Sequence, residues 1–168
     1  MTLADDLELA QHLARISDRL ATGRGPDNVR AWAKVDGSEV TELDLSIEQA
    51  LLEVLARERP DDAILAEESG ISGSPHTANG RRWVIDPLDG TRIFLNGGQS
   101  WGTHIALEEH GRVVVAIITR PGLGFHYWGA LDQGAWLSRV GMPASSAQRL
   151  HVTHHSQLAT ARVVGFGG

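Results

Sequence analysis

The spacing of apolar residues changes once along this chain, and that change constrains the fold more than any other feature of the sequence. Before Pro60, apolar residues recur at intervals of three and four, which is the period of one face of an α-helix. From Ala63 onward the pattern becomes short apolar runs and alternation, which are typical of strands. The sequence therefore predicts an α+β protein in which two N-terminal helices pack on a large antiparallel sheet.

Both helical patterns have recognisable ends. The first comprises Leu3, Leu7, Ala10, Leu13, Ile16 and Leu20. A Gly-Arg-Gly-Pro segment at 23–26 ends it. The second comprises Leu43, Ile47, Leu51, Val54 and Leu55. Thr41 opens this second helix and Pro60 follows its end, so that Asp44 lies in the first turn.

Two short buried runs each stop at acidic residues. The run 63–66 is followed by Glu67 and Glu68, and the run 83–85 stops at Asp86. Taken alone, the two glutamates are more typical of solvated acids at the start of a helix or loop than of a site. If the two runs are neighbouring strands, however, their ends bring several carboxylates to one edge of a sheet. Such crowding of negative charge is electrostatically costly without a cation.

The rest of the chain predicts an antiparallel meander. Alternating or apolar segments lie at 101–107, 113–118, 125–128 and 135–137, and turns separate them at 110–111, 121–122 and 132–134. An apolar pair follows at Leu150 and Val152, and a strand-like run occupies 162–166. We expect the meander to form most of the large sheet.

Composition excludes several classes of protein. The sequence contains no cysteine, which removes disulfides, thiolate metal sites and cysteine nucleophiles. With 15 Lys and Arg against 21 Asp and Glu, the formal net charge is -6, and no basic run is available for a phosphate backbone. The longest aliphatic run, 113–118, is too short to cross a bilayer. We expect a soluble cytoplasmic protein that binds no nucleic acid and no membrane.

The hexapeptide Asp-Pro-Leu-Asp-Gly-Thr at 86–91 carries the most chemistry. A hard divalent cation prefers several oxygen ligands. The carboxylates of Asp86 and Asp89 can face one point on a tight turn, and the carbonyl of Leu88 can add a third oxygen. Gly90 suits this geometry because it tolerates backbone angles that a side chain resists. The alternative for this segment is a solvated turn that binds no ligand.

Three motifs together resemble the signature of a known enzyme family. They are Lys-x-Asp-Gly-Ser-x-x-Thr-x-x-Asp at 34–44, Glu-Glu-Ser at 67–69 and Trp-Val-Ile-Asp-Pro-Leu-Asp-Gly-Thr at 83–91. In order and spacing they resemble the inositol monophosphatase family of magnesium-dependent, lithium-sensitive phosphatases, which has a sugar-phosphatase-like fold. The likeness continues through Ser-Trp-Gly at 100–102 to Leu-His-Val at 150–152, and in character it is similar to the bacterial histidinol-phosphate phosphatase branch.

The resemblance implies a set of metal ligands. Glu67, Asp86 and the Leu88 carbonyl would bind a first metal ion, and Asp86 and Asp89 would form part of a second site. The cofactor expected from the family is Mg²⁺, as two or more ions, with Mn²⁺ or Ca²⁺ able to substitute in binding. One ion would lower the pKa of a bound water and the other would stabilise the leaving oxygen.

The resemblance also implies the catalytic and substrate-binding residues. Asp44 and Thr91 would orient the attacking water, and Glu67 joins them in the catalytic set. Gly90 and Thr91 would present backbone N–H groups to the phosphate of the substrate. The expected reaction is hydrolysis of a small-molecule phosphate monoester such as histidinol phosphate or an inositol phosphate. The alternative is a truncated or repurposed family member that binds metal, phosphate or a partner without turnover.

Members of this family continue into a C-terminal α/β half, and the resemblance leads us to expect that this half is missing here. The predicted division is a metal- and phosphate-binding α+β domain at 1–148 and the start of a truncated half at 149–168. Without that half, apolar surface and a sheet edge near Val163 and Val164 would be open. Since such surfaces recruit another chain, we expect a homo-oligomer, most simply a homodimer.

Overall fold

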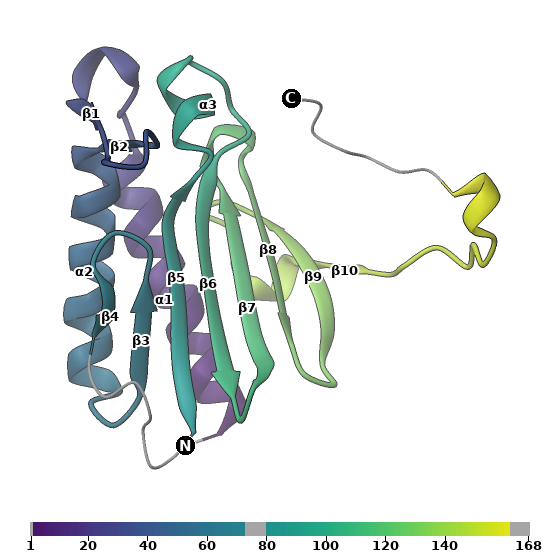
Figure 1. The fold of residues 1–168 in the computed structure, drawn as a ribbon. Coiled ribbons are helices and arrows are strands. Elements are labelled where there is room, and N and C mark those ends of the chain that lie inside the picture. Colours follow the sequence, from purple (N-terminus) through teal and green to yellow (C-terminus); the bar gives the residue numbers. More distant parts are fainter. Residues whose placement is uncertain (1, 73–79, 162–168) are drawn as a thin grey trace.

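The computed structural model describes residues 2–72 and 80–161, and in it helices cover one face of a mostly antiparallel sheet (Figure 1). The α-helices are α1 (Leu3–Ala21), α2 (Glu42–Glu58) and α3 (Thr91–Leu95). The strands are β1 (Ala31–Ala33), β2 (Glu39–Thr41), β3 (Ala63–Ala66), β4 (Gly70–Ser72), β5 (Arg81–Asp89), β6 (Gly102–Glu109), β7 (Arg112–Arg120), β8 (Phe125–Ala130), β9 (Gly134–Arg139) and β10 (Gln148–Leu150). Short 3-10 helices are η1 (Pro26–Asn28), η2 (Pro121–Leu123), η3 (Ala144–Ser146) and η4 (Leu158–Thr160). The predicted α+β class is confirmed.

Both long helices begin with a capping box, as the positions of their threonines suggest. The Thr2 side chain accepts a hydrogen bond from the backbone N–H of Asp5, and the Asp5 carboxylate accepts one from the backbone of Thr2. Thr41 and Asp44 repeat the arrangement at the start of α2. The second cap is buried and the first is exposed, so only the second one can organise an interior site.

The sheet confirms that the two acidic-ended segments are neighbours. Its strand order is β10-β9-β8-β7-β6-β5-β3-β4, and β3 and β5 run parallel while the other neighbouring pairs are antiparallel. The predicted meander is formed by β6 to β9, and β1 and β2 form a separate two-stranded ribbon. Parallel pairing of β3 and β5 brings their C-terminal ends, and the acids beyond them, to the same edge.

One prediction about this edge is wrong. The strand expected to stop at Asp86 continues to Asp89, because β6 goes on providing partners for it. Asp86 lies opposite His104 and Asp89 opposite Gly102, with a register shift between the two pairs. This irregularity accommodates Pro87, which has no N–H to donate to a ladder. Asp86 therefore lies within a strand, where neighbouring backbone holds it more rigidly than a free turn would.

The hydrophobic core lies between the two long helices and one face of the sheet. α1 packs across β6, β7 and β8 and against α2, which in turn packs on β5. The buried core includes Leu13, Ile47, Leu51, Leu55, Trp83, Ile85, Ile105, Leu107 and Ile117. Trp83 and Trp101 are buried, whereas Trp128 and Trp136 are half-buried and stack with ring centroids 5.5 Å apart.

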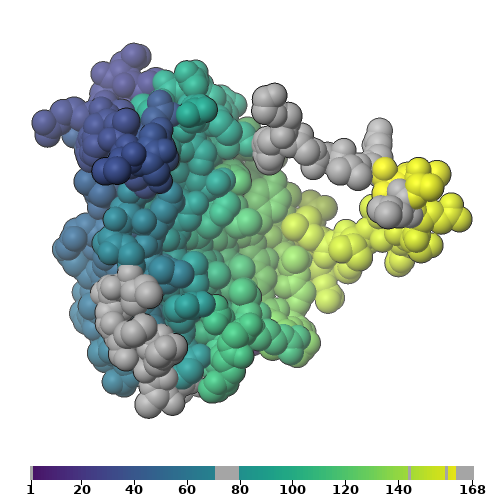
Figure 2. Space-filling model, viewed as in Figure 1, coloured from purple at the N-terminus to yellow at the C-terminus, as the bar shows by residue number. Residues whose placement is uncertain are grey.

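The second face of the sheet is covered by no α-helix of residues 2–72 and 80–161. Ala106, Ala116 and Ile118 are half-buried on this face, and Tyr127 is 38% exposed. Beyond β10 the chain extends away from the sheet as far as residue 161 (Figure 2). The expected domain boundary after residue 148 stays a prediction, and the run 162–166, with Val163 and Val164, lies outside the described residues. Within the described ranges no helix is both long enough and apolar enough to span a bilayer.

Candidate active site

Three side chains from neighbouring strands meet on the second face of the sheet. They are Asp86 and Asp89 of β5 and His104 of β6, and one ligand atom from each lies within 4.8 Å of the others. The strand register causes this, because Asp86 and His104 are directly opposite residues and directly opposite side chains share a face. Two carboxylates and an imidazole at this separation form a donor set that can bind a divalent cation.

The electrostatics of Asp86 support a cation site. Burial, together with the nearby charge of Glu67, a hydrogen bond with Glu67 and the charge of Asp89, raises the pKa of the Asp86 carboxyl to about 8. The backbone N–H of Leu88, 3.1 Å from Asp86 Oδ1, partly offsets this effect. A carboxylate so crowded by other acids needs a positive charge or a proton nearby. The carboxylates of Asp86, Glu67 and Asp89 therefore form a group of oxygen ligands that fits a hard divalent metal ion.

Asp89 has two basic neighbours. Arg120 Nη1 lies 3.0 Å from Asp89 Oδ2, and His104 Nε2 lies 3.4 Å from the same oxygen. Burial lowers the pKa of His104, with Asp89 acting in the opposite direction and Arg120 acting with burial. Within the described part of the chain, His104 Nε2 is buried and has no hydrogen-bond partner. A neutral imidazole with an unused nitrogen beside two carboxylates is suited to metal ligation.

A second group lies at the buried start of α2. Asp44 is 1% exposed, and its Oδ2 accepts a hydrogen bond from the backbone N–H of Thr41 at 2.9 Å. Its Oδ1 lies 3.2 Å from the hydroxyl of Thr91, which is also 2.9 Å from the carbonyl oxygen of Leu88. Burial raises the pKa of Asp44, and the hydrogen bonds from Thr41 and Thr91 only partly oppose it. The single hydroxyl proton of Thr91 is thus shared between two acceptors.

Glu67 lies just beyond β3 and extends its pairing with β5. Its backbone N–H donates to the carbonyl oxygen of Ile85 at 3.1 Å. The Lys34 ammonium lies 2.7 Å from Glu68 and 3.7 Å from Glu67. Burial opposes the charge on Lys34, yet the hydrogen bond and charge of Glu68 outweigh it and raise the pKa of Lys34. This lysine therefore compensates part of the acidic cluster, and the half-exposed carboxylate of Glu67 interacts with Asp86 as well.

Gly90 connects the two groups and has to be glycine. Its φ of 85° lies in the left-handed region, and a Cβ there would come within 3.3 Å of the carbonyl oxygen of Ser100. The tight backbone at this point sends the chain directly from β5 into α3, so that Thr91 turns back toward Asp44. All the residues predicted for the site therefore lie in one region, where β3, β5 and the start of α2 meet.

Comparison with known proteins now identifies the family. The model of the inositol monophosphatase family matches residues 6–165. The chain belongs to the inositol monophosphatase family. The predicted membership of this family and the predicted sugar-phosphatase-like α+β fold are both confirmed.

Similar proteins carry different names. A Streptomyces griseus protein named glucose-1-phosphate thymidylyltransferase is 45% identical over 162 residues, which are 96% of this chain and 62% of that protein. The histidinol-phosphatase of Streptomyces coelicolor is 38% identical over 162 residues, 94% of this chain and 58% of the relative. Among solved structures, the Thermotoga maritima IMPase is 28% identical with a TM-score of 0.71, and the match covers 89% of this chain and 54% of that one. The chain thus spans about three fifths of the length of these curated relatives.

This inositol monophosphatase family chain also has two site residues that sequence reasoning missed. His104 lies in a segment interpreted only as an alternating strand, and Arg120 ends the next strand. The alternation places His104 on the face opposite Ile105, but only the register with β5 shows that Asp86 shares that face. Arg120 reaches Asp89 across the intervening strand, so no local pattern could have indicated it.

Proposed function

We propose that this chain contains the metal- and phosphate-binding part of a Mg²⁺-dependent phosphatase that hydrolyses a small-molecule phosphate monoester. The observation that carries the proposal is that the proposed metal ligands and the proposed water-orienting residues meet at Leu88. Its carbonyl oxygen accepts from Thr91, whose hydroxyl also reaches the buried Asp44, and Leu88 itself lies between Asp86 and Asp89. Groups that would bind cations and groups that would orient a water are therefore linked by one backbone atom. The histidinol-phosphatase relatives support the same class of reaction.

The cation ligands would come from β5 and the end of β3. Glu67, Asp86 and the Leu88 carbonyl would hold one Mg²⁺, and Asp86 and Asp89 would contribute to a second. When bound, the cations would acidify a water molecule and neutralise charge on the phosphate. Lys34 and Arg120 already compensate neighbouring carboxylates, so the acids are kept close together without being fully neutralised.

Thr91 and Asp44 would position the water and accept its proton. In this arrangement Thr91 Oγ1 takes a proton from the water while its own proton passes to Asp44 Oδ1, 3.2 Å away. Burial raises the pKa of Asp44, so its ionised carboxylate takes up a proton more readily than an exposed carboxylate does. The backbone N–H groups of Gly90 and Thr91 would hold phosphate oxygens in line with that water.

His104 extends the donor set beyond the residues that the family resemblance implies. We expect its Nε2 to ligate the cation shared by Asp86 and Asp89. An imidazole suits Mn²⁺ better than Mg²⁺, because nitrogen donors favour transition metals over hard alkaline-earth ions. The chain should therefore bind Mn²⁺ more tightly than Mg²⁺ in calorimetric titration, and His104→Leu should reduce that preference. If His104→Leu weakened the binding of both ions equally, or of neither, His104 would not be a ligand of this cation.

Phosphate release from a panel of monoesters tests the proposed activity. The panel contains histidinol phosphate, inositol phosphates and, because of the Streptomyces griseus relative's name, glucose 1-phosphate. We expect metal-dependent release that falls at least 100-fold in Glu67→Gln and Thr91→Ala. The exposed Glu53→Gln is the matched acid-to-amide control and should retain full turnover.

A parallel metal titration separates the two main alternatives. Metal binding without release from any ester would favour a family member that binds metal or phosphate without turnover. Release unaffected by Glu67→Gln and Thr91→Ala would place the reaction elsewhere and overturn the proposed site.

A further inference from the structure

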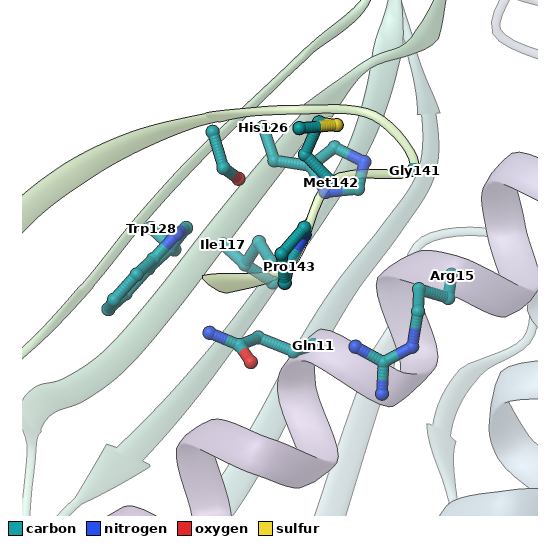
Figure 3. A pocket seen from close by; sticks show the side chains of 9 residues that line it. Gln11, Arg15, Ile117, His126, Trp128, Gly141, Met142 and Pro143 are labelled. Atoms are coloured by element: carbon teal, nitrogen blue, oxygen red, sulfur yellow. The ribbon is translucent and has the colours of Figure 1, made fainter. Parts of the chain in front are cut away.

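A cavity lies on the helix-covered face of the sheet, separate from the candidate active site on the other face. It is formed by α1, by β7, β8 and β9 and by the loop that follows β9, and its volume is about 390 Å³ (Figure 3). Cavities of about 300–1,000 Å³ are typical of sites for small molecules. Gln11 and Arg15 line it from α1, and His126 and Trp128 line it from β8.

The positive charge in this cavity has no partner among the residues that the structure describes. The guanidinium of Arg15 takes part in no ion pair or hydrogen bond among residues 2–72 and 80–161, although it lines the cavity from an exposed position. Two arginines elsewhere in the fold, Arg59 and Arg81, both bind the buried carboxylate of Asp6. An acidic protein that leaves one cavity-lining guanidinium unpaired keeps it available for an external anion.

His126 provides a second polar group that is already oriented. It is 8% exposed, and its Nε2 lies 2.6 Å from the Asp18 carboxylate on α1. Because a carboxylate can only accept, Nε2 is the donor of this bond, and Nδ1 of the neutral ring can only accept. No described residue bonds to Nδ1. Ser138, directly opposite His126 on β9, adds a hydroxyl to the same wall.

The remaining lining is apolar. Ile117, Trp128 and Met142 lie around the polar groups, and Gln11 lies across the cavity from Trp128 (Figure 3). A ligand here would place a charged group near Arg15 and an apolar body against Trp128. This combination of an apolar wall with a few convergent polar groups is the usual make-up of a small-molecule site.

We propose that this cavity binds a small organic anion, a carboxylate or phosphate ester whose apolar part packs on Trp128. Arg15 forms the ion pair, and the Ser138 hydroxyl donates a hydrogen bond to the same anion, while His126, held by Asp18, forms the adjoining wall. The site is independent of the proposed phosphatase centre, because the sheet separates the two and the cavity contains no residue of the acidic cluster.

Methyl NMR tests the proposal directly. The chain has only two methionines, Met1 and Met142, so ¹³C-methyl-methionine labelling gives one signal from the cavity wall and one from the terminus. Titration in EDTA uses benzoate and phenyl phosphate as the two anionic probes and benzamide as the uncharged isostere. We expect saturable shifts of the Met142 methyl with at least one anion, no shift of Met1, and binding of benzamide at least tenfold weaker.

Variants identify the group that binds the anion. Arg15→Gln should weaken binding at least tenfold, while Arg19→Gln, an exposed arginine of the same helix that does not line the cavity, should bind as the parent chain does. Thermal melting confirms that both variants are folded. The proposal is overturned if no probe shifts the Met142 methyl at millimolar concentration, if benzamide binds as well as benzoate, or if Arg15→Gln binds unchanged.

Discussion

A half-buried carboxylate crowded by other acids is stabilised by a proton or by a cation, and Asp86 is such a group. Its pKa is raised because burial and the neighbouring Glu67 and Asp89 disfavour the ionised form. The folded chain therefore holds this proton more tightly than the unfolded chain. Without metal, the stability due to Asp86 is fully present below its ordinary pKa of 3.8 and is lost as pH rises toward the folded value of about 8.

Asp86→Asn should consequently have opposite effects with and without metal. In EDTA at pH 8 the substitution removes an unfavourable charge, so we expect a gain of about 1 kcal/mol after allowance for solvent screening, or about 2–4 °C in melting temperature. Added Mg²⁺ should stabilise the parent chain by mass action and the variant little or not at all. Differential scanning calorimetry from pH 5 to pH 8 measures both effects.

The exposed Asp61→Asn is the matched control, since Asp61 lies in a solvated turn. It should change neither the pH dependence nor the response to Mg²⁺. If Asp86→Asn were less stable than the parent chain in EDTA at pH 8, Asp86 would be stabilised by groups other than a cation.

At the scale of elements, the buried cap of α2 holds the site as well as the helix. Thr41 is 0% exposed and accepts hydrogen bonds from the backbone N–H groups of Leu43 and Asp44 at 3.1 and 3.3 Å. The same threonine donates to the Asp44 carboxylate through its hydroxyl and its backbone N–H. One residue therefore ends the β1–β2 ribbon, starts the helix and orients the proposed proton acceptor.

Substitution of the two caps separates these roles. Thr41→Ala and Thr2→Ala each remove a capping hydroxyl, and each should cost about 0.5–2 kcal/mol of unfolding free energy. Only Thr41→Ala should also lower phosphate release, because only Asp44 loses its orientation. Thr41→Ser should restore most of both properties. Equal activity of the two alanine variants, measured at a temperature where both are folded, would mean that the cap serves the helix alone.

At the scale of the whole molecule, the sheet is covered unevenly. The helices pack on one face, while on the other Ile118 is half-buried and Tyr127, opposite both Ile118 and Leu137, is 38% exposed. Soluble monomers rarely expose a contiguous apolar patch of large area, and strands at sheet edges pair readily with other chains. We therefore propose that copies of this chain associate through the second face.

We expect the 168-residue chain by itself to form dimers or larger assemblies at micromolar concentration. Tyr127→Glu places a charge on the second face and should shift the population toward monomer. Val35→Glu, at a fully exposed turn away from the sheet, is the matched control and should leave assembly unchanged. Sedimentation velocity over a dilution series measures the populations. A monomer at every concentration that binds no apolar dye would contradict the expectation.

The sequence by itself determined the helices, the meander and most of the candidate site. Local spacing carries this information: helical periodicity and capping threonines place Asp44, and a short motif after a buried run places Asp86, Asp89 and Thr91. The interactions that define these features span few residues, so a linear pattern preserves them. Family resemblance added the roles of these residues, which spacing alone did not distinguish from a solvated turn.

Only the tertiary structure decided which distant residues join these local motifs at the candidate site. His104 is a ligand candidate because of the β5–β6 register, and Arg120 reaches Asp89 because of the order of strands in the sheet. The cavity likewise depends on α1 crossing β8, which brings Arg15 and His126 to the wall of one cavity. Strand register, strand order and helix placement are set by the simultaneous burial of apolar faces across the whole chain. No segment of the sequence specifies them alone.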